Sequence, residues 1–227
     1  MVQDNGRARR GVIPVASGRA APYEMVKQAI LRGELEPGQQ LIETALAEWC
    51  QVSRTPIREA LSRLVQDGLA ERSDRGLIVR RRSPEEILDI YETRIVLEAT
   101  VGRVAAQRRS DFDVHTLHRI IERAREVGPD DERKVEVNRQ FHLAMWRASH
   151  NESLLDLLER LNLHLARYPA TTLSYPGRWE EAKREHGAIV DAVEARDEAR
   201  AYELALDHFT RARDIRLGLW DELPGDA

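Results

Sequence analysis

The chain has 227 residues, of which 42% are hydrophobic and 33% are charged, so it can build one large packed domain or two modest ones. No apolar run approaches the ~18 residues that a membrane span needs, and the first residues contain no apolar leader segment. The single cysteine, Cys50, cannot form an intrachain disulfide. These features exclude a disulfide-rich secreted protein and a membrane-spanning one, and we expect a cytoplasmic protein.

Charge is divided unevenly along the chain, whose net charge is −4. Residues 1–82 contain 14 Lys and Arg against 10 Asp and Glu, whereas the remaining residues contain 21 against 29. A basic N-terminal part joined to an acidic C-terminal part favours a nucleic-acid-binding module attached to a second domain. Residues 1–21, which are interrupted by glycines and a proline, are predicted to be a flexible tail.

Residues 22–82 are predicted to form a winged helix-turn-helix, in which three helices precede a β-hairpin. The hydrophobic pattern and the turn residues place helices at 23–32, 43–50 and 55–67, and strands at 69–72 and 77–80. The inward faces are expected to carry the following residues: Tyr23, Val26, Ile30, Leu46, Ala47 and Cys50.

The third of these helices has a marked start and one apolar face. Thr55 is expected to cap it and Pro56 to occupy its first position. Its apolar residues recur at helical spacing and form one stripe: Ile57, Ala60, Leu61, Leu64 and Val65. Two arginines, Arg54 and Arg58, are left exposed at its beginning. A helix packed on one side with arginines leading on the other is typical of a recognition helix that enters the DNA major groove.

The rest of the chain, residues 83–227, is predicted to be an all-helical domain. Helices are expected at 84–109, 111–127, 130–149, 152–168, 179–195 and 198–220, the first of them capped by Ser83. The stretch 169–178 is predicted to be non-helical, either as a plain connection or as a mobile loop over a pocket. The fold class is therefore mainly α, with a small β wing.

Arg94 and Glu98 are a charged pair within the apolar stripe of the first of these helices. Two interpretations stay open for this pair, because buried charges must be satisfied. The pair is an internal salt bridge, or Arg94 points into a cavity and binds an anionic ligand.

Histidines on three later helices fall on inward faces, namely His142, His186 and His208, and Asn138 lies one turn before the first of them. A lone inward histidine is usually a hydrogen-bonded core residue, but three favour convergence on a first-row metal such as Zn or Ni. Glu185 is expected to project about 100° away from its neighbour His186 around the helix.

The N-terminal part resembles the DNA-binding domain of GntR-type bacterial transcription regulators. The resemblance covers residues 22–82 and rests on the run Val52-Ser53-Arg54-Thr55-Pro56-Ile57-Arg58-Glu59-Ala60-Leu61. It implies DNA contacts from the following residues: Thr44, Ser53, Arg54, Thr55, Arg58, Arg75 and Gly76. One departure is Gln51, where the family usually has glycine in the turn, so a positive φ is expected there at modest cost.

The C-terminal part resembles the FCD ligand-binding domain of the FadR-type branch of that family. The matching segments are Arg94-Ile95-Val96-Leu97-Glu98, Phe141-His142, Glu185-His186 and Asp207-His208-Phe209. The resemblance implies a divalent metal held by Asn138, His142, His186 and His208, and a homodimer. Asn138 stands where the family has an aspartate, so this ligand is neutral here.

The sequence therefore predicts a dimeric regulator, a repressor in most such proteins, that binds an operator in double-stranded DNA. A small organic acid is expected to bind the metal and Arg94 and to change operator affinity. One alternative is a helical metalloenzyme fused to a DNA-binding module, although few inward carboxylates accompany the histidines. Another is a regulator with a metal-free effector site. We expect a non-enzymatic protein.

Overall fold

The computed structural model describes residues 21–165 and 172–221, and the chain separates into two compact units between Arg81 and Arg82. The expected tail at 1–21 lies outside the described residues except for Ala21. The first unit contains α1 (Pro22–Leu31), α2 (Glu43–Cys50), α3 (Arg54–Gln66), β1 (Ala70–Ser73) and β2 (Gly76–Val79). The second contains α4 (Pro84–Arg108), α5 (Asp111–Glu126), α6 (Asp131–Ala148), α7 (Glu152–Leu165), the short 3₁₀ helix η1 (Thr172–Ser174), α8 (Arg178–Glu194) and α9 (Glu198–Asp221). The predicted fold class is confirmed.

The first unit packs its helices around the apolar stripe of α3. The expected inward residues of α1 and α2 are buried, as are Ile57, Ala60, Leu61 and Leu64 of α3. Val65 is 37% exposed, because it lies at the edge of that stripe. The strands pair antiparallel, with Ala70 opposite Val79.

The start of α3 differs from the expectation. Ser53 has extended backbone angles and precedes the first helical residue, Arg54, so Thr55 and Pro56 already lie within the first turn. A proline is tolerated there because the first four N–H groups of a helix have no acceptor within it. Gln51 adopts φ of 55°, the left-handed conformation that ends α2 and lets the chain turn into α3.

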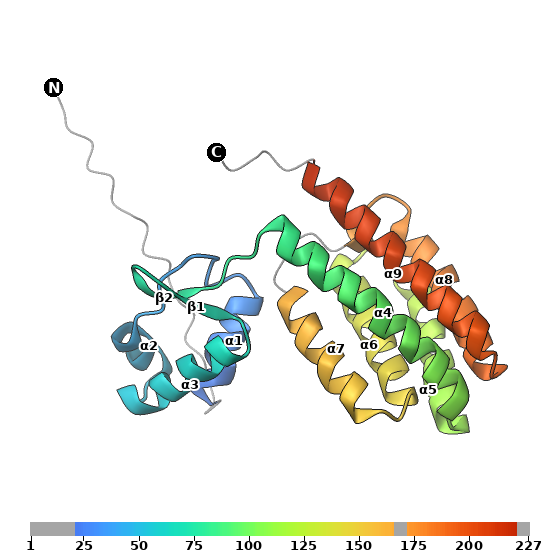
Figure 1. The fold of residues 1–227 in the computed structure, drawn as a ribbon, viewed down its shortest axis with the longest axis horizontal. Helices are drawn as coiled ribbons and strands as arrows, with labels where there is room; N and C mark the ends of the chain where they lie inside the picture. Colours follow the sequence, from blue (N-terminus) through green and yellow to red (C-terminus); the bar gives the residue numbers. More distant parts are fainter. Residues whose placement is uncertain (1–20, 166–171, 222–227) are drawn as a thin grey trace. The chain divides into compact units, whose positions relative to one another are not determined.

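The second unit is a bundle in which α4 and α9 run alongside each other (Figure 1). Gly102 makes this approach possible, because a Cβ atom at that position would lie 2.5 Å from the backbone oxygen of Ala201. Helix α4 begins with the expected cap, since the Ser83 hydroxyl accepts a hydrogen bond from the Glu86 backbone N–H. Helix α8 begins at Arg178, within the stretch predicted to be non-helical, after Gly177 at φ of 79°.

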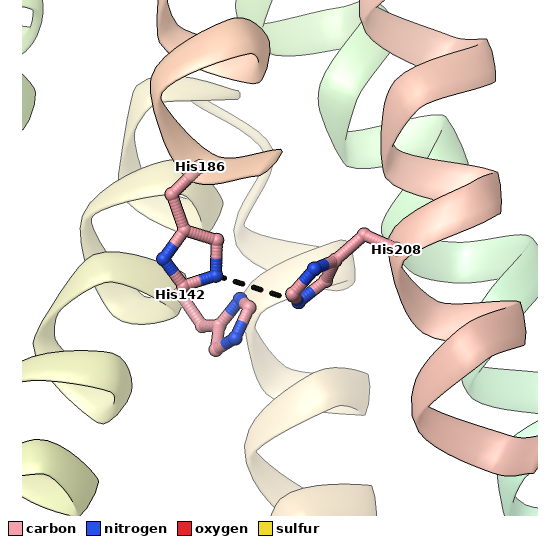
Figure 2. A group of neighbouring side chains, drawn as sticks. All are labelled: His142, His186 and His208. Atoms are coloured by element: carbon pink, nitrogen blue, oxygen red, sulfur yellow. Dashed lines mark hydrogen bonds between the residues drawn. The ribbon is translucent and has the colours of Figure 1, made fainter. Parts of the chain in front are cut away.

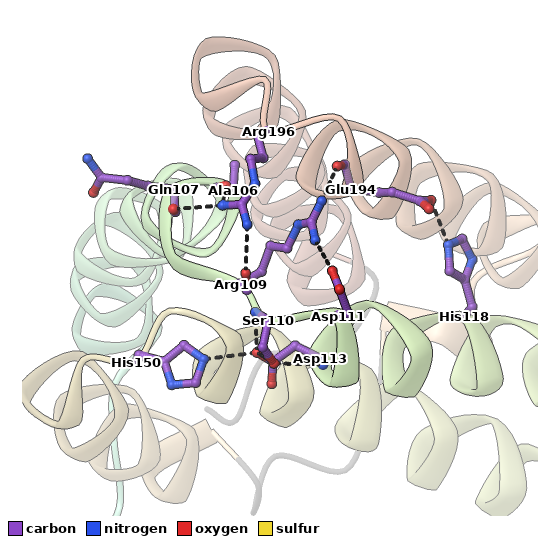
Figure 3. Close-up of polar contacts among 10 residues, drawn as sticks. All are labelled: Ala106, Gln107, Arg109, Ser110, Asp111, Asp113, His118, His150, Glu194 and Arg196. Atoms are coloured by element: carbon purple, nitrogen blue, oxygen red, sulfur yellow. Dashed lines mark hydrogen bonds and ion pairs between the residues drawn. The ribbon is translucent and has the colours of Figure 1, made fainter.

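Polar side chains fasten the ends of several helices together (Figure 3). Arg196 donates from Nη1 to the Gln107 carbonyl at 3.0 Å and from Nη2 to the Arg109 carbonyl at 3.2 Å. Arg109 in turn donates to the Glu194 carbonyl at 2.8 Å. These bonds satisfy carbonyl groups that have no partner within their own helices.

Two further histidines bind carboxylates in this region, away from the predicted metal ligands. His118 Nε2 lies 2.8 Å from Glu194 Oε2, and His150 Nε2 lies 2.9 Å from Asp113 Oδ2 (Figure 3). Both are surface contacts, so these histidines connect helices rather than form part of a buried site.

Candidate functional site

The exposed N-terminus of α3 carries the predicted DNA-contacting residues on one surface. The side chains of Arg54 and Arg58 are 58% and 61% exposed, and Ser53 and Thr55 are exposed beside them. Thr44, which lies in the first turn of α2, is exposed as well. Side-chain hydroxyls, arginines and the free N–H groups of a helix start are the groups that bind phosphates and base edges.

A carboxylate that the sequence interpretation did not single out connects the two arginines. Glu43 Oε2 accepts a hydrogen bond from Arg58 Nε at 2.9 Å and lies 3.6 Å from Arg54 Nη2. Glu43 is the first residue of α2, so it reaches across to the start of α3. Helical periodicity within one segment contains no signal for such a contact between two helices.

The turn of the hairpin presents Arg75 and Gly76 to solvent. Gly76 has φ of 100°, a conformation that L side chains rarely adopt, and the Ser73 hydroxyl accepts the Arg75 backbone N–H at 3.2 Å. The Gln40 side-chain amide donates to the Arg75 carbonyl. These two hydrogen bonds connect the wing tip to Ser73 and Gln40 and leave Arg75 exposed.

The three predicted histidines of the second unit meet in its interior (Figure 2). His142 comes from α6, His186 from α8 and His208 from α9, and they are 6%, 2% and 4% exposed. Their candidate ligand nitrogens all lie within 4.8 Å of one another. Residues separated by up to 66 positions in the chain therefore form one buried cluster.

The spacing and chemistry of this cluster fit a divalent metal. His186 Nε2 and His208 Nε2 lie 3.4 Å apart. Two nitrogen ligands at ~2.0–2.1 Å from a tetrahedral ion lie about 3.3–3.4 Å apart, so this separation suits one centre. Phe141 stacks on His186 with ring centroids 3.8 Å apart, which restrains that imidazole.

Glu185 corrects the expectation that few inward carboxylates accompany the histidines. Its Oε2 lies 2.6 Å from Nδ1 of His208, the histidine that α9 contributes. A carboxylate that accepts the Nδ1–H of a histidine fixes the tautomer and leaves Nε2 as the free ligand atom. The sequence interpretation missed this role because Glu185 and His208 belong to different helices.

Two arginines hold that carboxylate in place. Arg178 Nη1 lies 2.7 Å from Glu185 Oε2, and Arg211 Nη1 lies 2.6 Å from Glu185 Oε1. The same two arginines also bind Glu181. The Arg178 side chain is 1% exposed, and its buried Nε has no hydrogen-bond partner among the described residues. Arg178 was not among the predicted site residues, because it lies in the stretch 169–178 that was predicted to be non-helical.

Burial lowers the pKa of His142 and His186 well below the ordinary 6.5, and the surrounding positive groups lower it further. Burial also lowers the pKa of His208, against the contrary effect of Glu185. Burial raises the pKa of Glu185, but the contacts with His208 and Arg178 outweigh it and the net shift is downward. The histidines are therefore neutral near pH 7, as metal ligands must be.

Arg94 makes the internal salt bridge, and it also borders the histidine cluster. Its Nε lies 3.1 Å from Glu98 Oε1, while the Trp146 indole donates to the other carboxylate oxygen at 2.8 Å. Its guanidinium carbon lies 4.9 Å from the ring centroid of Phe209, a residue that packs against His142 and His208. Burial raises the pKa of Glu98 despite these partners.

Asn138 is half-buried one turn before His142 on α6. Two surface cavities of the second unit, about 480 and 330 Å³, are lined by residues other than the three histidines and Arg94. In the part of the chain that the structure describes, no helix combines the length and apolar character required to span a membrane.

Comparison with protein families gives two matches. Residues 20–79 match the model of bacterial regulatory proteins of the gntR family, and residues 89–211 match the FCD domain.

Relatives with similar sequences are transcription regulators by name. The chain is 32% identical over 195 residues to the uncharacterized HTH-type transcriptional regulator YdhC of Bacillus subtilis, covering 82% of this chain and 85% of that protein. It is 30% identical to LutR of the same organism, with 85% and 98% covered, and 30% identical to the transcriptional repressor GlaR of Escherichia coli, with 82% and 90% covered. Among solved structures, E. coli McbR/YncC is similar with a TM-score of 0.71 at 24% identity, covering 88% of this chain and 96% of that one, a likeness of fold.

Proposed function

The chain belongs to the GntR family of bacterial regulatory proteins and carries an FCD domain, and from this membership we propose that it is a ligand-responsive transcriptional repressor. The DNA-binding domain comprises residues 22–82, and residues 83–227 form the ligand-binding and dimerisation domain. The observation that carries the proposal is the presence, in one chain, of an exposed arginine-bearing helix start and a separate buried histidine cluster.

Operator binding is assigned to the start of α3 and to the wing. Arg54 and Arg58 contact base edges, as bidentate arginine–guanine pairs do. The remaining residues assigned to this surface bind backbone phosphates or lie beside them: Thr44, Ser53, Thr55, Arg75 and Gly76. One winged domain reads few bases, so two copies in a homodimer would bind half-sites about one helical turn apart.

The histidine cluster is assigned to a divalent metal, Zn or Ni, with Asn138 Oδ1 as a fourth ligand. The 3.4 Å separation of the two Nε2 atoms and the hydrogen bond of His208 Nδ1 to Glu185 support this assignment. The bound metal would supply a Lewis-acidic position for a carboxylate. The assigned ligands, three histidines and Asn138, are all neutral and would leave the charge of the divalent metal uncompensated, so a small organic acid is the matching ligand class.

Arg94 is assigned to the bound acid. It borders His142 and Phe209, and its Nε is held by Glu98, so its two terminal nitrogens remain for a carboxylate. Because the histidines are only 2–6% exposed, a ligand reaches them through a displacement of the surrounding helices. That displacement is the proposed route by which ligand binding alters operator affinity in this cytoplasmic regulator.

Two experiments test these assignments. Metal analysis of the purified chain and of His142→Ala and His208→Ala should show about one divalent ion per chain, lost in both variants. Unchanged metal content would remove the metal assignment. Arg54→Ala and Arg58→Ala should each weaken binding to a selected operator by about 1–3 kcal/mol if they read bases. Turnover of a bound acid would favour the enzyme alternative instead.

A further inference from the structure

The contact that Glu43 makes with both recognition arginines has no explanation in the stability of the fold. The two arginine side chains are about 60% exposed and the Glu43 side chain is 35% exposed, and ion pairs this accessible to solvent contribute little to folding. A carboxylate on a surface that approaches DNA also repels phosphates. The position of Glu43 between Arg54 and Arg58 therefore indicates a role in DNA binding.

We propose that Glu43 is a positioning residue that makes DNA binding selective by holding Arg54 and Arg58 in the arrangement that reads bases. The inference rests on the proposed function, in which these arginines contact the operator. It extends that function to a residue that does not itself read a base.

The geometry explains how one carboxylate can act on two arginines. Arg54 and Arg58 are one turn apart on α3, where like charges repel. A single oxygen, Glu43 Oε2, lies 2.9 Å from Arg58 Nε and 3.6 Å from Arg54 Nη2, which offsets that repulsion. Because Arg58 is held through Nε, its edge formed by the two Nη groups stays available for guanine O6 and N7.

The carboxylate also disfavours the competing mode of binding. A freely rotating arginine binds a phosphate at any sequence, and such contacts dominate non-specific affinity. An arginine already paired with Glu43 gains less from a phosphate, while its fixed orientation lowers the entropy cost of a base contact. Loss of Glu43 should thus raise non-specific affinity and lower the preference for the operator.

The test compares Glu43→Gln with Glu48→Gln in the full chain. Glu48 is exposed on the same helix, and the part of the chain that the structure describes offers it no ion pair. The probe is the duplex most enriched when the wild-type chain selects from a random-sequence pool, measured against a shuffled duplex of equal length. Thermal unfolding is recorded for every variant, so that a loss of folding is recognised.

Glu43→Gln should reduce the ratio of specific to shuffled-duplex affinity roughly tenfold, since one arginine–guanine pair provides about 5- to 150-fold discrimination. The salt dependence of shuffled-duplex binding should steepen by about 0.9 in the log–log slope for each arginine released to a phosphate. Glu48→Gln should change neither quantity by more than about twofold, a bound set by weak, screened surface charges.

Arg58→Ala distinguishes a failure of the positioning role from a failure of the assigned DNA surface. In that background, Glu43→Gln should change the ratio less than in the wild type, because Arg58, the arginine nearer to Glu43 Oε2, is absent and only the 3.6 Å contact with Arg54 remains. If Arg58→Ala weakens binding but Glu43→Gln behaves like Glu48→Gln, the positioning role is wrong and the assigned DNA surface stands. If Arg58→Ala itself leaves operator binding unchanged, the assigned DNA surface fails.

Discussion

Glu185→Gln is the substitution that most directly examines the histidine cluster. Glu185 accepts from His208 Nδ1 at 2.6 Å and is bound by Arg178 and Arg211 at 2.7 and 2.6 Å. A glutamine keeps the shape, but its amide nitrogen must face either an arginine or His208. At least one donor then faces another donor, and His208 either loses its acceptor or keeps a neutral amide oxygen in place of the carboxylate.

Glu185→Gln should lower both the metal affinity and the free energy of unfolding of the metal-free protein. Removing a carboxylate that orients a metal-binding histidine typically lowers metal affinity by about 10- to 100-fold, or roughly 1.4–2.7 kcal/mol. The Glu185 side chain is 17% exposed, and Arg178 beside it is 1% exposed. Loss of a charged hydrogen-bond partner there should lower the free energy of unfolding of the metal-free protein by about 2–3 kcal/mol.

Glu181→Gln is the matched control, because Glu181 contacts the same two arginines without contacting His208. Zn²⁺ affinity is measured by competition with a chromophoric chelator, and unfolding of the metal-free protein is measured by denaturant titration. Both variants should lose stability, but only Glu185→Gln should lose metal affinity by tenfold or more. Equal metal affinities in the two variants would refute the role of Glu185 in orienting His208.

Gly102→Ala should lower the free energy of unfolding by about 1–3 kcal/mol, because its Cβ would lie 2.5 Å from the Ala201 oxygen. The matched Gly187→Ala, with no atom within 4 Å, should be neutral or stabilising in the same denaturant titration. The three buried histidines have lowered pKa values, so they bind protons more readily in the unfolded chain than in the folded one. The melting temperature of the metal-free protein should therefore fall as the pH drops below 6.5. A melting temperature that does not change with pH would contradict this. Arg196→Gly keeps a residue that readily adopts the φ of 56° but removes the hydrogen bonds to the Gln107 and Arg109 carbonyls. It should lower the free energy of unfolding by about 1–2 kcal/mol. An unchanged midpoint of chemical denaturation would show that these hydrogen bonds do not stabilise the fold.

The sequence predicted the elements well where periodicity and caps were strong. The stripe of α3 and the capped start of α4 belong to this group, since both depend on neighbours within one segment. The start of α3 was misplaced because Thr55 and Ser53 are both good capping residues. Helix α8 begins at Arg178, one residue before the predicted start and directly after Gly177 in the left-handed conformation, so this prediction agrees with the structure to within one residue.

Helical periodicity by itself determined which side chains point inward on each helix, and so identified His142, His186 and His208 as candidates for one site. Periodicity determines the direction in which each side chain projects around its own helix axis. It does not determine which faces of different helices pack against each other. The tertiary structure alone decided that Glu185 supports His208 and that Glu43 joins the two recognition arginines. Both contacts pair residues from different helices, and only the packing of those helices brings the charges together.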